Sequence, residues 1–344
     1  MNTVTRTVAR LLGTAGALAL AVVAAPALAQ DACEKPAETK SITVMADWIP
    51  WSNQGPMFTA INKGYYQAEG IEVKVISPAN PADPIKLVAR ERVQFSMTYV
   101  PEVMLSRETG IPVVSAAVAL YKLSSGLTAM GEENIKKPAD LKGKILGVGP
   151  KADAQAFLDT ILEAGGLTRK DVQIVDPGFG HITYLMTKKV AAAHVLEYAE
   201  HMITSELAKK EGKAEPTFLR YSDFGVPKFY YQLYVAPERW IAKNGATACR
   251  FLRATQKGVQ DYFGKQEWKE TNKWIHSKNE IFSLDQHNGM AQAIATHWQD
   301  PDGKYWVQKE AVWKEAQDWA IKRKLITIPE DPKKYFTNRY VPKS

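Results

Sequence analysis

The stretch that decides the fold is Asp47-Trp48-Ile49-Pro50-Trp51-Ser52-Asn53-Gln54-Gly55-Pro56. Apolar side chains alternate through residues 42–46 just before it, which predicts a short buried strand. Its two prolines predict a loop at the carboxyl end of that strand, and the apolar pattern from Met57 predicts a helix that ends near Gly64. Ligands of α/β proteins bind at the carboxyl ends of strands, so we interpret the stretch as a binding loop. The alternative is a loop whose tryptophans only pack against the core.

The N-terminus has the pattern of a secretory signal peptide. Arg6 and Arg10 precede an apolar run over residues 11–25, and Ala27-Leu28-Ala29 forms a small-residue cleavage site. We therefore expect residues 1–29 to be removed and the mature protein to be exported to the periplasm. No later stretch reaches the roughly 18 uninterrupted apolar residues that a membrane-spanning helix needs.

Composition excludes several classes of protein. The chain has 344 residues, 44 Lys and Arg, and 37 Asp and Glu. The charges are interspersed, and the densest basic cluster, Lys322-Arg323-Lys324, is typical of a solvated face because no nucleic-acid module accompanies it. The only cysteines are Cys33 and Cys249, whose spacing fits no metal motif. In an oxidising compartment these two could pair and tie the N-terminal segment to the body, a question that the sequence leaves open. We expect neither a metal nor a cofactor.

Strands and helices alternate along most of the chain. After the first helix, apolar runs predict strands at residues 71–76, 94–99, 113–120, 145–148, 172–175, 191–196 and 229–235. Helical patterns lie at residues 85–90, 101–108, 154–163 and 182–188, and again from residue 238 onward. This alternation predicts an α/β protein with a parallel-rich sheet, long enough for two domains.

The order of several short motifs resembles that of the periplasmic solute-binding proteins of ABC importers. The first loop is followed by Lys63-Gly64-Tyr65-Tyr66 and by Glu69-Gly70-Ile71-Glu72-Val73, and further pieces follow at residues 110–114, 138–144, 156–159, 251–254, 318–319 and 335–338. The branch that the chain most resembles is the thiamine-precursor-synthase-like one, close to the sulfonate, taurine and nitrate binders. Each piece alone is a weak signal, but together they cover almost the whole mature chain.

The resemblance implies a two-lobed periplasmic-binding-protein fold of type II, with a hinge and a ligand cleft between the lobes. Lobe I would comprise residues 30–122 and 222–344, and lobe II residues 123–221. The expected function is to capture a small, flat and polar solute as a monomer and to present it to the permease subunits of an importer. A ligand-presenting sensor protein of the same fold remains an alternative.

Enzymes of the same branch are a second alternative. They make the thiamine pyrimidine from their own histidine and pyridoxal phosphate, and their first loop carries that histidine. Gln54 stands at about this position here, and the cysteine cluster of the enzymes is absent. The pyrimidine binders usually have Asn-Thr-Asn-His where this chain has Trp51-Ser52-Asn53-Gln54. We therefore predict a binding protein rather than an enzyme, with a different face toward its ligand.

The first loop supplies four candidate ligand-binding residues. Trp48 and Trp51 could stack on a flat ligand through their ring faces. Asp47 could accept hydrogen bonds from an amine or a ring N–H, or it could cap the loop instead. Asn53 could either donate to and accept from a ligand or stabilise the loop.

Seven further candidates follow later strands. They are Tyr99 and Glu102 at a strand-to-helix junction, Asp153 before a helix, His181, Glu197 and Tyr198 after a strand, and Tyr230 near the return to the first lobe. The first four have structural alternatives: a helix start for Tyr99 and Glu102, an N-cap for Asp153 and a structural histidine for His181. Tyr230 and Tyr231 should face opposite sides, so one of them could face the cleft. The C-terminal tryptophans at positions 298, 306, 313 and 319 are predicted to lie in the core.

Overall fold

The computed structural model describes residues 32–343. The predicted signal peptide, residues 1–29, lies outside the described residues. Within them, no helix combines the length and the apolar character that crossing a membrane requires.

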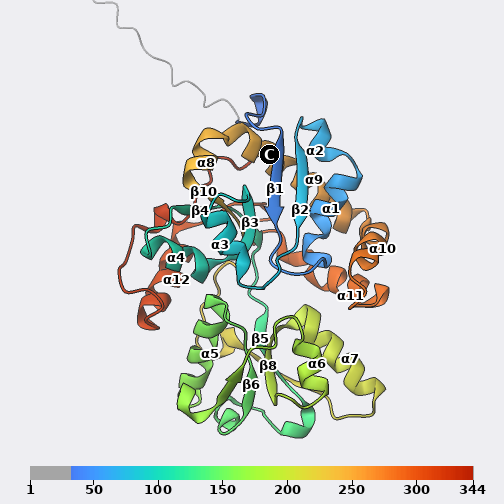
Figure 1. Ribbon diagram of the computed structural model, residues 1–344, viewed down its shortest axis with the longest axis vertical. Helices are drawn as coiled ribbons and strands as arrows, with labels where there is room; N and C mark the ends of the chain where they lie inside the picture. The colour runs from blue at the N-terminus through green and yellow to red at the C-terminus, as the bar shows by residue number, and fades with distance from the viewer. Residues whose placement is uncertain (1–31, 344) are drawn as a thin grey trace, which may run out of the picture. The chain divides into compact units, whose positions relative to one another are not determined.

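Five strands form the first sheet, which we call sheet A (Figure 1). Its order is β2-β1-β3-β10-β4, and β1 runs parallel to both β2 and β3, whereas β10 runs antiparallel to β3 and β4. The strands are β1 (Ser41–Met45), β2 (Glu72–Ile76), β3 (Phe95–Tyr99), β4 (Val113–Leu120) and β10 (Gln232–Pro237).

Sheet B repeats this arrangement with the order β7-β6-β8-β5-β9. Strand β6 runs parallel to β7 and β8, and β5 runs antiparallel to β8 and β9. The strands are β5 (Ser125–Ala129), β6 (Ile145–Gly147), β7 (Gln173–Val175), β8 (Ala192–Leu196) and β9 (Thr217–Arg220). Both sheets are therefore mixed, with a parallel part that was predicted and an antiparallel part that was not.

The sequence analysis did not recognise β5 or β9 as strands. Strand β5 reads Ser-Gly-Leu-Thr-Ala, which has few of the large and β-branched residues that favour strands. Small side chains fit there because β5 is buried along its whole length between β8 and β9. A Cβ at Gly126 would lie 2.6 Å from the carbonyl oxygen of Leu219 on β9, so this close pairing depends on glycine.

Helices flank both sheets (Figure 1), with α5, α6 and α7 beside sheet B. The helices that follow strands of sheet A are α1 (Gly55–Asn62), α2 (Tyr65–Ala68), α3 (Asp83–Ala89), α4 (Val100–Glu108), α8 (Glu238–Lys243) and α9 (Gly245–Val259). The others are α5 (Ala152–Ala164), α6 (His181–Met186), α7 (Met202–Lys210), α10 (Trp268–Lys278), α11 (Leu284–Ile294) and α12 (Glu310–Lys322).

The first loop is shorter than predicted. A 3₁₀ turn covers Ser52–Gln54, and α1 begins at Gly55 with Pro56 in its first turn. A proline is compatible with that position because the first helical N–H groups have no partner within the helix. The helix ends as expected, with Lys63 as its C-cap and Gly64 in the left-handed conformation at φ 71°.

The chain crosses between the sheets at residues 121–124 and 221–231. The second crossing takes up the first part of the run that the sequence analysis assigned to a strand, so β10 begins at Gln232 rather than at Phe229. The division into lobes at residues 122/123 and 221/222 stays a prediction.

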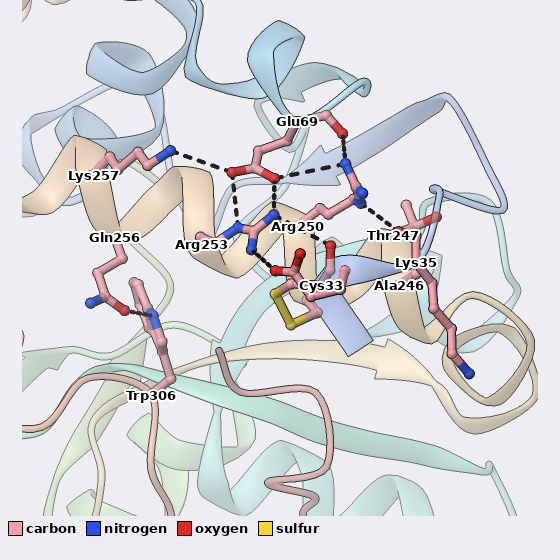
Figure 2. The surroundings of a disulfide bond; sticks show 12 residues. Cys33, Lys35, Glu69, Ala246, Thr247, Arg250, Arg253, Gln256, Lys257 and Trp306 are labelled. Atoms are coloured by element: carbon pink, nitrogen blue, oxygen red, sulfur yellow. Dashed lines mark hydrogen bonds and ion pairs between the residues drawn. A yellow bond between two sulfur atoms is a disulfide. The ribbon is translucent and has the colours of Figure 1, made fainter. Parts of the chain in front are cut away.

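A disulfide between Cys33 and Cys249 ties the start of the described chain to α9 (Figure 2). Their Cα atoms are 5.0 Å apart, and the two residues are separated by 216 positions in the sequence. The sequence left this pairing open, and the structure forms it.

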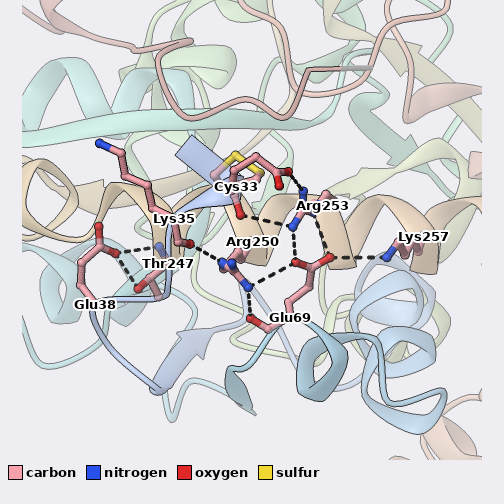
Figure 3. Close-up of polar contacts among 10 residues, drawn as sticks. Cys33, Lys35, Glu38, Glu69, Thr247, Arg250, Arg253 and Lys257 are labelled. Atoms are coloured by element: carbon pink, nitrogen blue, oxygen red, sulfur yellow. Dashed lines mark hydrogen bonds and ion pairs between the residues drawn. A yellow bond between two sulfur atoms is a disulfide. The ribbon is translucent and has the colours of Figure 1, made fainter. Parts of the chain in front are cut away.

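Ion pairs reinforce this attachment (Figure 3). The buried carboxylate of Glu69 accepts hydrogen bonds from Arg253 Nε at 2.9 Å and Nη2 at 2.6 Å, and Lys257 Nζ lies 3.4 Å away. The third guanidinium nitrogen, Nη1 of Arg253, donates to Glu34 beside the disulfide. One face of α9 thus binds both the N-terminal segment and the turn before β2.

The four C-terminal tryptophans lie in the core, as predicted. Trp298, Trp306, Trp313 and Trp319 are each at most 6% exposed. Trp306 donates its indole N–H to Gln256 Oε1 at 3.0 Å, which fixes the C-terminal segment against α9 (Figure 2).

Candidate functional site

A cavity of about 50 Å³ lies between the two sheets, where parallel strands from both present their carboxyl ends. Its lining from the sheet A side includes Trp48 after β1, Tyr99 at the end of β3, and Tyr231. Its lining from the sheet B side includes Lys151, Asp153, Asp176, His181, His194 and Glu200, which follow or belong to β6, β7 and β8. The cavity therefore lies at the carboxyl ends of strands from both sheets, which is where α/β proteins bind ligands.

Trp48 forms an aromatic wall of this cavity. Its ring contacts Phe179 edge-on, with centroids 4.5 Å apart, and the ring of His181 lies 5.7 Å away. Phe179 lies in the segment between β7 and α6 and His181 begins α6, so the indole of Trp48 contacts the sheet B side.

Asp47 holds the first loop in place. Its Oδ1 accepts a hydrogen bond from Gln54 Nε2 and its Oδ2 accepts one from the hydroxyl of Tyr99, both at 2.9 Å. The carboxylate is 1% exposed and lies behind the cavity lining rather than in it. This geometry corresponds to the loop-stabilising alternative that the sequence left open.

Trp51 and Asn53 make contacts with the sheet B side, away from the cavity lining. Asn53 Nδ2 donates to the hydroxyl of Tyr198 at 2.9 Å, and the rings of Trp51 and Tyr198 lie 6.4 Å apart. All three residues are at most 5% exposed. Tyr198 stands in the π-helical turn Glu197–His201 after β8, so this cluster joins the loop after β1 to the turn after β8.

Lys151 is a cavity residue that the sequence analysis missed. It is the N-cap of α5, and its ammonium reaches across to the sheet A side. Its Nζ lies 3.5 Å from both the carbonyl oxygen of Asp47 and the hydroxyl of Tyr99. The same atom stands 4.6 Å from the ring centroid of Tyr99 and 5.3 Å from that of Trp48, which are cation–π distances.

Carboxyl groups of Asp153, Asp176 and Glu200 line the same cavity as this ammonium. Asp153 lies in the first turn of α5 and is not its N-cap, because Lys151 takes that position. The Oδ1 of Asp153 is buried without a hydrogen-bond partner among the described residues. Burial raises the pKa of Asp153 and also raises the pKa of Glu200 to about 7, because the charged carboxylate is desolvated.

Glu102 lies one layer behind, at the start of α4. Its Oε2 accepts hydrogen bonds from the backbone N–H of Tyr99, at 3.2 Å, and from the hydroxyl of Thr98. Burial, with a repulsive contribution from Asp153, raises the pKa of Glu102 to about 7. The contacts correspond to the helix-start alternative, since Glu102 caps the helix that follows Tyr99.

Two neutral histidines complete the lining. Burial lowers the pKa of His181 to about 4 and that of His194 to about 3. His194 Nδ1 shares a hydrogen bond of 3.0 Å with the hydroxyl of Tyr221, whereas Nδ1 of His181 is buried without a partner among the described residues. Neutral imidazoles can donate and accept hydrogen bonds without adding charge.

Two sequence candidates lie away from this cavity. Glu197 forms an ion pair with Arg220 and is partly exposed. Tyr230 lines a second cavity of about 470 Å³ with Lys122, Lys228 and Lys309, and its hydroxyl accepts from the backbone N–H of Lys309. Its neighbour Tyr231 lines the first cavity, 5.1 Å from the ring of Tyr99, so the two tyrosines do face different sides.

Of the eleven sequence candidates, Trp48, Tyr99, Asp153 and His181 line the cavity. The sequence analysis missed Lys151, Asp176, His194 and Glu200, and of the pair Tyr230 and Tyr231 it chose the tyrosine that does not line this cavity. Lys151 and Asp176 follow strands that were predicted, so the rule that favours strand ends could have found them. Glu200 had no signal, because nothing in the sequence marks the π-helical turn that carries it. Among residues 32–343 no group of three or more His, Cys, Asp or Glu side chains could hold a metal ion.

Solved structures with the same arrangement include periplasmic binding proteins. The periplasmic aliphatic sulphonate binding protein of Escherichia coli has a TM-score of 0.63 at 12% identity, covering 89% of this chain and 93% of its own. A Candida albicans protein described as exhibiting the generic periplasmic binding protein structural fold has a TM-score of 0.62 at 12% identity, covering 89% and 98%. The fold of this chain is therefore the predicted one.

Sequence relatives include both a binding protein and an enzyme. The formylaminopyrimidine-binding protein of Halalkalibacterium halodurans is 27% identical over 283 residues, which is 81% of this chain and 84% of that one. A 4-amino-5-hydroxymethyl-2-methylpyrimidine phosphate synthase of Saccharomyces cerevisiae is 24% identical over 312 residues, or 88% of each chain. A family model described as NMT1/THI5 like matches residues 51–267, and this chain belongs to that family.

Proposed function

We propose that this protein is the solute-binding subunit of an ABC importer and that it captures a flat, amino-substituted heterocycle between its two sheets. The observation that carries the proposal is the composition of the cavity between the strand ends. Aromatic rings of Trp48, Tyr99 and Tyr231 supply flat walls, and buried carboxyl groups supply hydrogen-bond acceptors.

The hydrogen-bonding groups of the cavity support an amine rather than an anion. Asp153, Asp176 and Glu200 line it, whereas Lys151 is its only lysine or arginine. A sulfonate or nitrate has no N–H or O–H group to donate to these carboxyl oxygens, whereas amino groups and ring N–H groups would find acceptors in them. The orphan Oδ1 of Asp153 is one such acceptor. An aminopyrimidine, the ligand class named for one relative, has suitable ring faces and donors.

The volume of the cavity supports a hinge. About 50 Å³ is well below the roughly 300 Å³ at the lower end of small-molecule sites. Entry of a heterocycle therefore requires the two sheets to separate, with bending at the crossings near residues 121–124 and 221–231. Lobes divided at these crossings would close again around the bound solute, and the permease subunits would recognise the closed form.

Binding without catalysis is the second part of the proposal. Gln54 stands where the related enzymes carry their histidine, and both of its amide atoms are engaged by Trp51 and Asp47. Both cysteines form the disulfide, so the described chain offers no thiol. We expect a monomer in the periplasm. A role as a ligand-presenting sensor would use the same site and differs only in the membrane partner.

A thermal-shift experiment on the mature protein, residues 30–344, tests the ligand class. We expect 4-amino-5-hydroxymethyl-2-methylpyrimidine and its formylamino analogue to raise the melting temperature, and methanesulfonate and nitrate to leave it unchanged. A ligand at a hundredfold excess over its Kd stabilises the native state by about 2.7 kcal/mol, which such a scan detects. Stabilisation by the anions alone would contradict the proposal.

Replacement of one tryptophan locates the site. Trp48→Ala should abolish the shift, because the indole forms a wall of the cavity. Trp274→Ala is the matched control, since Trp274 is 37% exposed and packs on Phe58 outside the cavity. An unchanged shift in Trp48→Ala would place binding elsewhere. The synthase alternative is tested by incubating the protein with pyridoxal phosphate, and we expect no pyrimidine product.

A further inference from the structure

The ammonium of Lys151 lies in a place built to recognise a cation. It stands over the faces of Tyr99 and Trp48 and within 3.5 Å of two neutral oxygens, the carbonyl of Asp47 and the hydroxyl of Tyr99. Ring faces and neutral oxygens are the groups that surround amino and quaternary ammonium groups in binding sites.

The position of this ammonium is not explained by ion pairing. Within the described chain Lys151 forms no salt bridge, although Asp153 and Glu200 line the same cavity. The side chain extends from the start of α5 on the sheet B side, and all four of its contacts belong to residues of the sheet A side. Lys151 therefore links the two sides across the cavity through contacts that a solute amine could make equally well.

We propose that Lys151 is an internal competitor, whose ammonium occupies the solute's amine position between Trp48 and Tyr99 and latches the two sides together. This inference rests on the proposed function for the identity of the solute, but not for the latch itself. A solute amine entering the cavity takes over the ring faces, and the displaced Lys151 then pairs with a carboxylate of its own side, Asp153 or Glu200. This latch lowers the affinity of the protein for its solute, because each solute must first displace the Lys151 ammonium.

The test replaces Lys151 with methionine, which keeps the length of the side chain and removes the charge. Lys151→Met should increase the radius of gyration of the solute-free protein in small-angle scattering, because the link between the two sides is lost. The same variant should bind 4-amino-5-hydroxymethyl-2-methylpyrimidine about tenfold more tightly in calorimetry, an effect of the size expected for a desolvated cation–π contact.

A matched control separates the latch from a general effect of removing a lysine. Lys189 lies over the ring of Tyr184, 5.1 Å from its centroid, and both residues belong to the sheet B side. Lys189→Met should change neither the radius of gyration nor the affinity. If Lys151→Met unfolds partly, Lys151→Gln, which keeps a polar side chain, replaces it in both measurements.

A second ligand separates occupancy from charge. Removing one positive charge beside several carboxylates would by itself strengthen binding of an amine, but not of 2-methylpyrimidine, which lacks the amino group. If the lysine ammonium occupies the solute position, its removal should strengthen binding of both the aminopyrimidine and 2-methylpyrimidine. A gain confined to the amine would overturn the competitor role.

The remaining outcomes distinguish the two proposals. Weaker binding in Lys151→Met would make Lys151 a solute contact and overturn the latch. An unchanged radius of gyration in Lys151→Met would also overturn the latch, even if the wild type binds the aminopyrimidine as proposed. An increased radius of gyration without any pyrimidine binding would support the latch and contradict the proposed solute class.

Discussion

At the scale of single residues, burial shifts the pKa values of ionisable side chains at the candidate site. Glu200 is 7% exposed, and it accepts a hydrogen bond from the backbone N–H of Leu196 at 3.1 Å. Backbone hydrogen bonds to the carboxylate do not compensate for the loss of water, so burial raises the pKa of Glu200 to about 7 from an ordinary value of 4.5.

Glu200 should therefore make the protein less stable as the pH rises. Between about pH 4.5 and 7 the folded protein holds a proton on Glu200 that the unfolded chain has released, so the free energy of unfolding falls as the pH rises through this window. Glu200→Gln should flatten this slope and stabilise the protein by up to about 3 kcal/mol above pH 7. Urea unfolding from pH 4 to 8 measures the effect.

The control for this prediction is Glu315→Gln, an exposed glutamate on α12. The free energy of unfolding of Glu315→Gln should depend on pH as that of the wild type does. A Glu200→Gln variant whose stability depends on pH as the wild type does would show that Glu200 is already ionised in the folded protein at neutral pH.

At the scale of elements, the first loop is positioned by the contact between α1 and α9. The helix α1 begins directly after the 3₁₀ turn of the loop, and Pro56 stands in its first turn. A Cβ added to Gly258 on α9 would lie 2.1 Å from the carbonyl oxygen of Pro56 and 3.1 Å from the Cβ of Ala60. Glycine at 258 thus lets the two helices approach each other, and this contact sets where the loop lies.

Gly258→Ala should force these helices apart. The clash is with backbone, which cannot rotate away, so we expect a loss of about 2 kcal/mol in the free energy of unfolding. Solute affinity should fall as well, because Pro56 follows the loop that carries Trp48. Gly264→Ala is the matched control, since a Cβ there would meet nothing within 4 Å. Equal stability of the two variants would show that α9 adjusts without cost.

At the scale of the whole molecule, the disulfide constrains most of the chain. Cys33 and Cys249 are 216 positions apart, so the bond removes more conformational freedom from the unfolded chain than a short loop closure would. It also holds the segment before β1 on α9, together with the ion pairs of Glu69 and Arg253.

Reduction of this disulfide should lower the free energy of unfolding by about 5 kcal/mol, a value that follows from the loop-entropy relation for a loop of this length. Guanidinium titrations with and without dithiothreitol give the difference. The double variant Cys33→Ala, Cys249→Ala should match the reduced protein and should not respond to the reductant. If reduction leaves the midpoint unchanged, the ion pairs alone hold the N-terminal segment.

The sequence by itself determined the features that arise from local chemistry. Period-two alternation located β1, and prolines and glycines bounded the loop and helix around Trp48. These signals suffice because a strand end or a helix cap depends on residues a few positions apart. The α/β class and the loop that contributes Trp48 to the cavity followed from them.

Only the tertiary structure decided which side chains meet. Lys151 contacts residues 104 and 52 positions away, and Tyr231 rather than Tyr230 lines the cavity, where its ring lies 5.1 Å from that of Tyr99. The small residues of β5 form a strand because β8 and β9 enclose it. Each of these outcomes depends on packing between distant segments, which no local pattern in the sequence records.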